Sequence, residues 1–357
     1  MKTFSHPFVI GLIGTNCPSF AVICLSAFVV EYRRIALRPE LDVLLSQEPK
    51  RWVSRCERHY MTMGLNSELV TAIRARRSVR SYRNEPLSPD DESFLRALVD
   101  ELSEAEGPSG TRLRLLLSTE LELSGKVGTY GVIRGARSYV GAVTSNTPGS
   151  MLDLGYLFER MVIELTARGL GTCWLGGTFD RKSLAAGADL APGEILPIIT
   201  PVGYPAERSG LQDRFMRTMA GSDRRKPFGE LFFDGGFDRP HAAAGSWANA
   251  LELVRIGPSA SNKQPWRVVL APAGAASPTA AHIYLARTPG YIGTKLGFDI
   301  QRIDIGIAMY HLQAAMSASG HQGRWEFADP GIDPDSDIAP PSPPDEHTEY
   351  VASFCLT

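Results

Sequence analysis

One long stretch of this sequence occurs twice, and the repetition constrains the fold more than any other feature. The first copy runs from Asp153 to Gly177, and the second begins 151 residues later, at Asp304. The copies superpose without a gap, and the identical pairs are Asp153 and Asp304, Gly155 and Gly306, Ala167 and Ala318, Gly169 and Gly320, and Trp174 and Trp325. A period this long indicates a duplicated domain rather than a solenoid of short repeats.

Both copies carry the apolar spacing of an amphipathic helix. In the first copy the apolar residues are Leu154, Leu157, Phe158, Met161, Val162 and Leu165, and in the second they are Ile305, Ala308, Met309, Leu312 and Met316. Gly169 and Gly320 follow where a left-handed residue ends a helix. Either helix alone predicts only core packing. Their repetition predicts two related halves, each built around one of these helices.

Composition excludes several classes of protein. With 357 residues, of which 43% are hydrophobic and 21% charged, the chain has room for two soluble globular domains. A net charge of −2 gives no reason to expect nucleic acid or an anionic membrane as a partner. The five cysteines form no CxxC pair, and the histidines lack metal-ligand spacing. We therefore expect neither a disulfide framework nor a metal site.

Residues 1–62 differ in composition from the rest, and we expect them to lie outside the fold. Residues 8 to 30 are mostly apolar and long enough to span a bilayer, and Arg33 and Arg34 follow them. As a membrane anchor, this segment would leave the downstream domain in the cytoplasm. The alternatives are a disordered leader, or a working protein that begins at Met61 or Met63. The domain itself is expected to be cytoplasmic.

A basic segment opens the first half, which we place at residues 65–233. If Arg76 to Tyr82 is extended, its side chains alternate, so Arg76, Ser78 and Arg80 share one face. Two guanidiniums that flank a hydroxyl can grip a phosphate, because the planar fork of arginine binds phosphate through two hydrogen bonds. A solvated basic surface is the alternative interpretation.

Apolar runs predict the remaining elements of the chain. We expect helices at 89–105 and 247–256 and strands at 113–118, 138–144 and 195–203. The string GLGTCWLGG, residues 169–177, is expected to be a strand whose closing glycines let the backbone approach a flat ligand. Residues 234–246 have the composition of a linker.

The second half, residues 247–357, contains the most specific string in the chain. Residues 257–271 spell GPSASNKQPWRVVLA, a turn that runs into a strand. The hydroxyls and amides of this turn suit hydrogen bonding to a planar heterocycle, although a plain loop could have the same composition.

Together, RRSVRSY, GLGTCWLGG and PSASNKQPW resemble the signature segments of the nitroreductase family of FMN-dependent oxidoreductases. The resemblance covers about residues 65 to 357. Within the family, the sequence is similar to the TM nitroreductase branch, in which two subunits appear fused in one polypeptide. The resemblance implies an α+β fold, a three-layer α/β/α sandwich. Its two tandem halves, the second truncated, would form a pseudo-dimer in one chain that acts as a monomer. The first half carries only an eroded counterpart of the PSxxN segment, GPSGTRLRLLL from Gly107.

The resemblance also implies which residues bind FMN. Arg76, Arg77, Ser78 and Arg80 would hold the phosphate, the ribityl chain and one edge of the ring, and Leu175, Gly176 and Gly177 would present backbone amides to it. Arg224 or Arg225 would contact the phosphate, and Pro258, Ser259, Ala260, Asn262 and Gln264 would reach in from the second half. No catalytic side chain is expected, because the flavin carries the chemistry. The family's mid-sequence asparagine and lysine contacts have no recognisable counterpart.

The expected function is that of an FMN-dependent NAD(P)H oxidoreductase of nitroreductase type. NADH or NADPH would be the reductant, and nitroaromatic or quinone-like small molecules the acceptors. The alternatives are a non-catalytic protein that holds or senses FMN and a relic without cofactor. We expect one FMN per chain, because the second half lacks an arginine-serine segment and has Glu326 and Phe327 at the repeat positions of Leu175 and Gly176.

Overall fold

The computed structural model describes residues 67–119, 131–181, 187–206, 224–245, 247–272, 277–291, 296–327 and 338–357. By its internal contacts the chain divides into two units, Met1–Met61 and Thr62–Thr357, and all of the described residues belong to the second. The expected leader or membrane anchor therefore lies outside the described residues. Within the described part of the chain, no helix combines the length and apolar character needed to cross a membrane.

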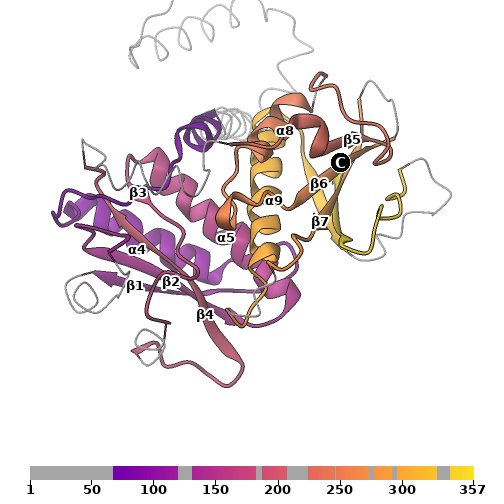
Figure 1. Cartoon of the computed structure of the whole chain (residues 1–357). Coiled ribbons are helices and arrows are strands. Elements are labelled where there is room, and N and C mark those ends of the chain that lie inside the picture. Colours follow the sequence, from indigo (N-terminus) through magenta and orange to yellow (C-terminus); the bar gives the residue numbers. More distant parts are fainter. Residues whose placement is uncertain are drawn as a thin grey trace, which may run out of the picture. The chain divides into compact units, whose positions relative to one another are not determined.

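Two sheets organise the described residues (Figure 1). The first is antiparallel, in the order β1 (Arg114–Thr119), β2 (Ser138–Ser145), β4 (Glu194–Gly203) and β3 (Gly171–Thr172). The second has the order β5 (Phe232–Asp234), β6 (Trp266–Ala271), β7 (Ala280–Ala286), β9 (Thr348–Leu356) and β8 (Gly323–Phe327), and in it only β5 and β6 pair in parallel. The strands expected at 113–118, 138–144 and 195–203 are confirmed.

The helices begin and end where local chemistry predicts. In α4 (Pro89–Glu104) the Ser88 hydroxyl accepts from the Asp91 amide, and in α5 (Pro148–Ala167) Thr147 caps the first turn. Two further helices are α8 (Ala248–Arg255) and α9 (Ile300–Ala318), and residues 67–75 are helical as well. Gly169 and Gly320 have φ values of 80° and 82°, so both repeated glycines lie in the left-handed region just beyond their helices. The two repeated helices are confirmed, and α5 begins earlier than the repeat, at Pro148.

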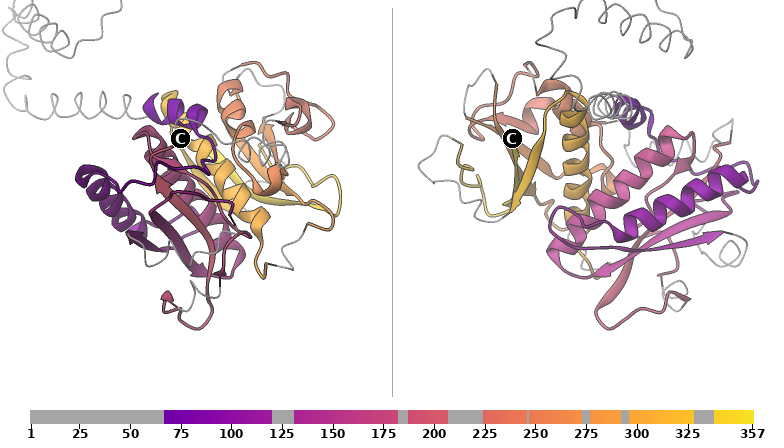
Figure 2. Two further views of the ribbon diagram at one scale, coloured as in Figure 1. Left: turned by 60° about the vertical axis from the view of Figure 1, so that its left-hand side comes forward. Right: turned by 180° about the vertical axis from the view of Figure 1, so that it is seen from behind.

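The two repeated helices, α5 and α9, cross at their shared glycines, Gly155 and Gly306. A Cβ on Gly155 would overlap the carbonyl oxygen of Ile303, and a Cβ on Gly306 would overlap that of Leu152. The backbones of α5 and α9 therefore touch at this crossing, which only glycine permits. The views in Figures 1 and 2 show the two helices side by side.

The described helices lie between the two sheets (Figure 2). Helices α4 and α5 cover one face of the first sheet, and α8 and α9 cover one face of the second. Side chains on the other face of the first sheet, such as Tyr139 and Leu196, pack against non-helical segments that carry Val79, Ile133 and Phe179. The mixed α and β content is thus confirmed, while the described helices do not flank both faces of one sheet as a three-layer sandwich requires.

Two segments depart from the local expectation. The strand expected over GLGTCWLGG is reduced to β3 and a single bridge between Leu175 and Ile199, because the Cys173 amide donates to the Thr200 hydroxyl at 3.0 Å instead of to a strand carbonyl. At the expected linker, Phe233 bridges Pro240 and the Asp234 carboxylate lies 2.7 Å from His241 Nδ1. Strand β5 and the turn after it therefore belong to the second sheet.

Candidate functional site

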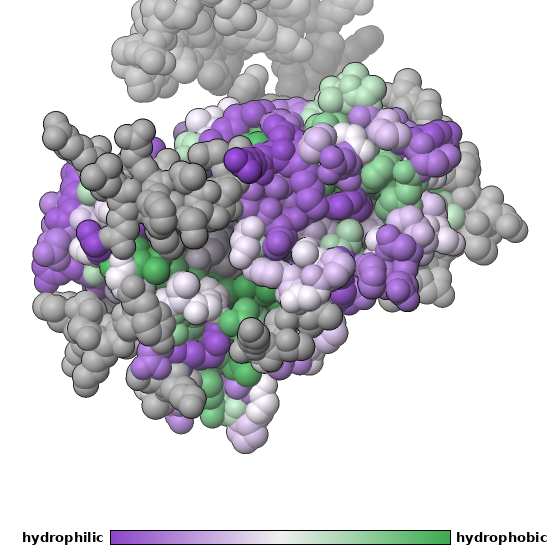
Figure 3. Space-filling view, viewed as in Figure 1, coloured by the Kyte–Doolittle hydropathy of each residue, from purple (hydrophilic) through white to green (hydrophobic). Residues whose placement is uncertain are grey.

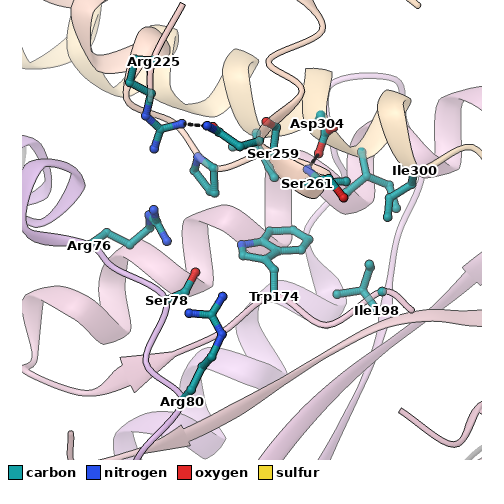
Figure 4. A pocket seen from close by; sticks show the side chains of 16 residues that line it. Arg76, Ser78, Arg80, Trp174, Ile198, Arg225, Ser259, Ser261, Ile300 and Asp304 are labelled. Carbon is teal, nitrogen blue, oxygen red and sulfur yellow. Dashed lines mark hydrogen bonds between the residues drawn. The ribbon is translucent and has the colours of Figure 1, made fainter. Parts of the chain in front are cut away.

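One pocket collects side chains from segments far apart in the sequence (Figure 4). Its empty volume, which includes open solvent at the mouth, is about 820 Å³. Its walls come from the basic segment, from the chain after β3, from β4, from the loop before β6 and from α9. The lining residues are Arg76, Ser78, Arg80, Trp174, Gly176, Ile198, Arg225, Pro258, Ser259, Ala260, Ser261, Asn262, Ile300, Ile303, Asp304 and Ile307.

The basic segment is held extended beside β3. The Val79 amide donates to the Thr172 carbonyl at 2.8 Å, and Ser78 forms a bridge with Thr172. Val79 is buried in the core and Arg77 is exposed to solvent. The other face presents Arg76, Ser78 and Arg80 to the pocket, as the predicted alternation requires, whereas Arg77 does not line it.

The loop of residues 258–262 has an unusual backbone. Ser261, Asn262 and Gln264 all have φ values near 50°, in the left-handed region that side chains disfavour. The Ala260 amide donates to Asp304 Oδ1 at 2.9 Å, which fastens the loop to α9. Gln264 is buried and its amide group donates to the Arg224 carbonyl, so Gln264 supports the loop and does not line the pocket.

The structure distinguishes between the two candidate arginines before β5. Arg225 lines the pocket, and its guanidinium donates to the Gly257 carbonyl at 2.8 Å and to Asn262 Oδ1 at 2.9 Å. Arg224 is exposed, and only its carbonyl oxygen takes part, as an acceptor from Asn262 Nδ2 at 2.7 Å. Arg225 therefore holds the loop of residues 258–262, which lines the pocket, through hydrogen bonds at both of its ends.

The three residues expected to present backbone amides differ in position. Leu175 is buried, and its amide donates to the Ile199 carbonyl at 3.0 Å, so this amide is already used within the sheet. Gly176 lines the pocket, and a Cβ there would lie 3.0 Å from the Ile300 side chain. Gly177 is exposed and outside the lining. The amide role expected of Leu175 is wrong, and Gly176 is the one member of the trio that lines the pocket.

Sequence reasoning missed the floor of the pocket. Three isoleucines of α9, Ile198 of β4 and the indole of Trp174 supply its apolar surface. Figure 3 shows hydrophobic surface near the centre of the face seen in Figure 1, below a broad hydrophilic area. The repetition of Trp174 as Trp325 was a signal, but a tryptophan at the end of a buried segment is indistinguishable in sequence from a core residue.

Asp304 is the one acidic residue among those that line the pocket. Its Oδ2 has no hydrogen-bond partner among the described residues. Burial raises the pKa of this carboxyl well above its usual range, and the hydrogen bond from Ala260 only partly opposes that shift. The raised pKa favours the uncharged form of Asp304, so the arginines dominate the charge that faces the pocket.

A mixed α and β fold with this arginine-rimmed pocket is nitroreductase-like. Residues 68–316 match the family described as "Putative TM nitroreductase", and the chain belongs to this family. It is similar to a "putative nitroreductase" from Thermotoga maritima, with 16% identity, coverage of 81% of this chain and 93% of that chain, and a TM-score of 0.49. A nitroreductase with bound FMN from Desulfitobacterium hafniense is 16% identical, with coverage of 40% and 91% and a TM-score of 0.34. No curated protein matches the chain.

Proposed function

We propose that this chain binds FMN in the pocket and acts as an NAD(P)H oxidoreductase of nitroreductase type. The observation that carries the proposal is the convergence of Arg76, Ser78 and Arg80 with Arg225 and the loop of residues 258–262 (Figure 4). Arginine forks suit a phosphate group, and a hydroxyl and loop amides suit a ribityl chain and a polar ring edge. The bound FMN of the Desulfitobacterium hafniense nitroreductase agrees with this assignment.

The residues present fit FMN in shape and charge. A Cβ on Gly176 would lie 3.0 Å from the Ile300 side chain and 3.1 Å from that of Ile198, so a side chain here would crowd the apolar wall on which a flat ring would rest. The apolar floor suits the face of a flat ring, and the raised pKa of Asp304 favours the uncharged form of the one carboxyl group in the lining, which reduces its repulsion of an anion. An arginine that faces the pocket would also stabilise negative charge that develops on the ring.

When bound, FMN would supply the hydride and electron chemistry, with NADH or NADPH as reductant. The chain would contribute binding, orientation and the exclusion of water. Arg76 and Ser78 would hold the phosphate end, Arg80 the ring edge, and the isoleucines the apolar face. Nitroaromatic or quinone-like molecules are the proposed acceptors, because they are flat and accept electrons without a side-chain nucleophile.

We further propose that the two halves are copies of one unit and form a pseudo-dimer within one chain. In the first half the Ser109 amide donates to Asp153 Oδ1 at 2.8 Å, and in the second the Ala260 amide donates to Asp304 Oδ1 at 2.9 Å. Each pair is separated by 44 residues, so the same contact recurs at the 151-residue offset. The mutual contact of Gly155 and Gly306 supports the same symmetry.

Flavin content tests the proposal directly. The full chain is purified, its flavin is released by denaturation, and the flavin absorbance is divided by the protein concentration from amino-acid analysis. We expect about one FMN per chain, since the basic segment occurs once, and we expect anaerobic NADH or NADPH to bleach the bound flavin. A protein that binds FMN but is bleached by neither reductant would be a flavin holder, and a protein that binds none would refute the proposal.

A further inference from the structure

A chain of buried hydrogen bonds runs beneath the pocket and ends on its floor. Trp174, a lining residue, donates its indole N–H to Glu159 Oε2 at 2.8 Å. Glu159 Oε1 lies 2.9 Å from His311 Nε2, and His311 Nδ1 lies 2.8 Å from the Leu253 carbonyl oxygen. The side chains of Glu159 and His311 are both 0% exposed. The repeat does not contain this chain twice, because Tyr310 stands at the repeat position of Glu159.

The hydrogen bonds fix how many protons the pair holds. A carbonyl oxygen only accepts, so His311 Nδ1 carries the hydrogen that goes to Leu253. Glu159 and His311 must then share one more proton, because two bare acceptors 2.9 Å apart in a dry site would repel each other. The pair is therefore neutral overall, whether it is an imidazolium with a carboxylate or an imidazole with a carboxylic acid. Every polar atom of the two side chains is satisfied.

The pair also reaches the opposite wall of the pocket. A Cβ on Gly257 would lie 3.4 Å from His311 Nδ1, so His311 packs against the residue that precedes the pocket loop. The Gly257 carbonyl in turn accepts from Arg225 at 2.8 Å. One end of the chain thus holds the indole, and the other supports the segment that carries residues 258–262.

We propose that Glu159 and His311 are positioning residues of the pocket, which fix the indole plane of Trp174 as its floor relative to the loop before β6. The inference rests on the proposed FMN site. Trp174 is half-buried, and without Glu159 its indole N–H would lose the acceptor that holds the ring in this orientation. The ring's edge contact with Phe158, at 4.9 Å between centroids, does not replace a hydrogen bond.

Two substitutions of Glu159 separate the effect of its hydrogen bonds from the effect of its side-chain volume. In Glu159→Gln the amide oxygen accepts from Trp174 and the amide N–H donates to a neutral His311, so both bonds survive. In Glu159→Leu both are lost at similar volume. We expect the FMN dissociation constant of the full chain, measured by flavin fluorescence titration, to stay within about twofold for Glu159→Gln and to rise about tenfold or more for Glu159→Leu.

The second half offers a matched control. Trp325, the counterpart of Trp174, donates its indole N–H to Gln313 Oε1 at 2.6 Å, and neither residue lines the FMN pocket. Gln313 Oε1 also accepts from the Tyr156 hydroxyl at 2.9 Å, so Gln313→Leu removes two hydrogen bonds, as Glu159→Leu does, and one of them holds the same kind of ring elsewhere. We expect it to leave FMN affinity unchanged, and to leave unchanged the visible circular dichroism of bound flavin, which reports how the ring is held.

The outcomes distinguish this inference from the function on which it rests. A wild-type chain that binds no FMN overturns both. Wild-type binding together with unchanged affinity and unchanged visible circular dichroism in Glu159→Leu overturns the positioning role alone, as does an equal loss of affinity in Gln313→Leu. If Glu159→Leu does not fold, Trp174→Phe removes the indole N–H while leaving the pair intact. A Trp174→Phe chain with wild-type affinity and wild-type dichroism would overturn the inference as well.

Discussion

Asp153 and Asp304 both begin the repeated stretch of the sequence, 151 residues apart, but they hold their loops differently. Asp153 accepts three hydrogen bonds, from the Ser109 amide at 2.8 Å, the Ser109 hydroxyl at 2.6 Å and the Thr111 amide at 2.8 Å. Asp304 accepts one, from the Ala260 amide, and its Oδ2 has no partner among the described residues. The sequence accounts for part of the difference, because Ala260 stands at the repeat position of Ser109 and has no hydroxyl.

The loop that has fewer hydrogen bonds to its aspartate is the one that lines the pocket. At the repeat position of Thr111, the amide of Asn262 donates to the Ser259 carbonyl instead of to the carboxyl group. Ser261 and Asn262 have left-handed backbones, and both lie in the pocket wall. A carboxyl oxygen without a partner among the described residues and several disfavoured backbone angles therefore lie together at the site proposed to bind a ligand. At the corresponding position, the carboxyl group of Asp153 uses both of its oxygens to hold the loop that carries Ser109 and Thr111.

The largest expected effect on the free energy of unfolding is at Asp153, which holds its loop with three hydrogen bonds. Asp153→Asn replaces an oxygen with an amide N–H that faces donors, so we expect the free energy of unfolding to fall by about 2–3 kcal/mol. Asp304→Asn keeps an acceptor for the single Ala260 amide, and at about pH 4, below the raised pKa of the wild-type carboxyl, we expect a change below about 1 kcal/mol. Urea denaturation of both variants measures the difference. Equal losses at the two positions would show that the loops are held alike.

Removing a positive charge should weaken FMN binding only when the charge lines the pocket. Arg76→Ala deletes a guanidinium that lines the pocket, and we expect FMN binding to weaken by about 1.5–3 kcal/mol, the scale of a charge-assisted hydrogen bond. Arg112→Ala is the matched control, because Arg112 lies on the first loop and pairs with the exposed Glu106. Isothermal titration with FMN measures both. Unchanged affinity in Arg76→Ala would show that the basic segment is only a solvated surface.

Burial raises the pKa of both carboxyl groups, but three hydrogen bonds oppose the shift at Asp153 and only one opposes it at Asp304, so we expect Asp304 to have the larger effect on the pH dependence of stability. Burial raises the pKa of Asp304 well above 3.8, so the folded protein keeps a proton that the unfolded chain releases. Stability is therefore lost as the pH rises from about 4 through the raised pKa, by at most about 1.4 kcal/mol per pH unit. In Asp304→Asn this loss is absent, so the variant gains stability relative to wild type as the pH rises. Urea denaturation of both proteins between pH 4 and 8 measures the trend, and parallel profiles would contradict it.

Local patterns predicted what local geometry determines. The helical spacing around Asp153 and Asp304 gave both central helices, and the alternation through Arg76, Ser78 and Arg80 gave the face that lines the pocket. Pairings between distant residues left no such trace in the sequence. The Leu175 amide is taken by Ile199, which lies in another strand.

The pocket floor and the second sheet illustrate the same limit. Ile300, Ile303 and Ile307 follow a helical period that is common to core residues and pocket-lining residues, so nothing in the sequence distinguished them. The parallel pairing of β5 with β6 depends on two segments that meet only in the folded chain. Trp174 and its buried partners Glu159 and His311 come from three separate elements, and side-chain hydrogen bonds of this kind have no sequence period.

The smallest predicted effect comes from a substitution that makes the loop at Ala260 resemble the loop at Ser109. Ala260→Ser adds at position 260 the hydroxyl that Ser109 uses to donate to Asp153 Oδ2 at 2.6 Å. Because Asp304 Oδ2 has no partner among the described residues, we expect the new hydroxyl to donate to it and to raise the free energy of unfolding by about 1 kcal/mol. The same bond stabilises the ionised carboxylate, so the loss of stability with rising pH should become shallower. Urea denaturation at pH 5 and pH 8 measures both effects. A variant no more stable than wild type, with the same pH dependence, would mean that the difference between the loops lies in their backbones and not in one missing hydroxyl.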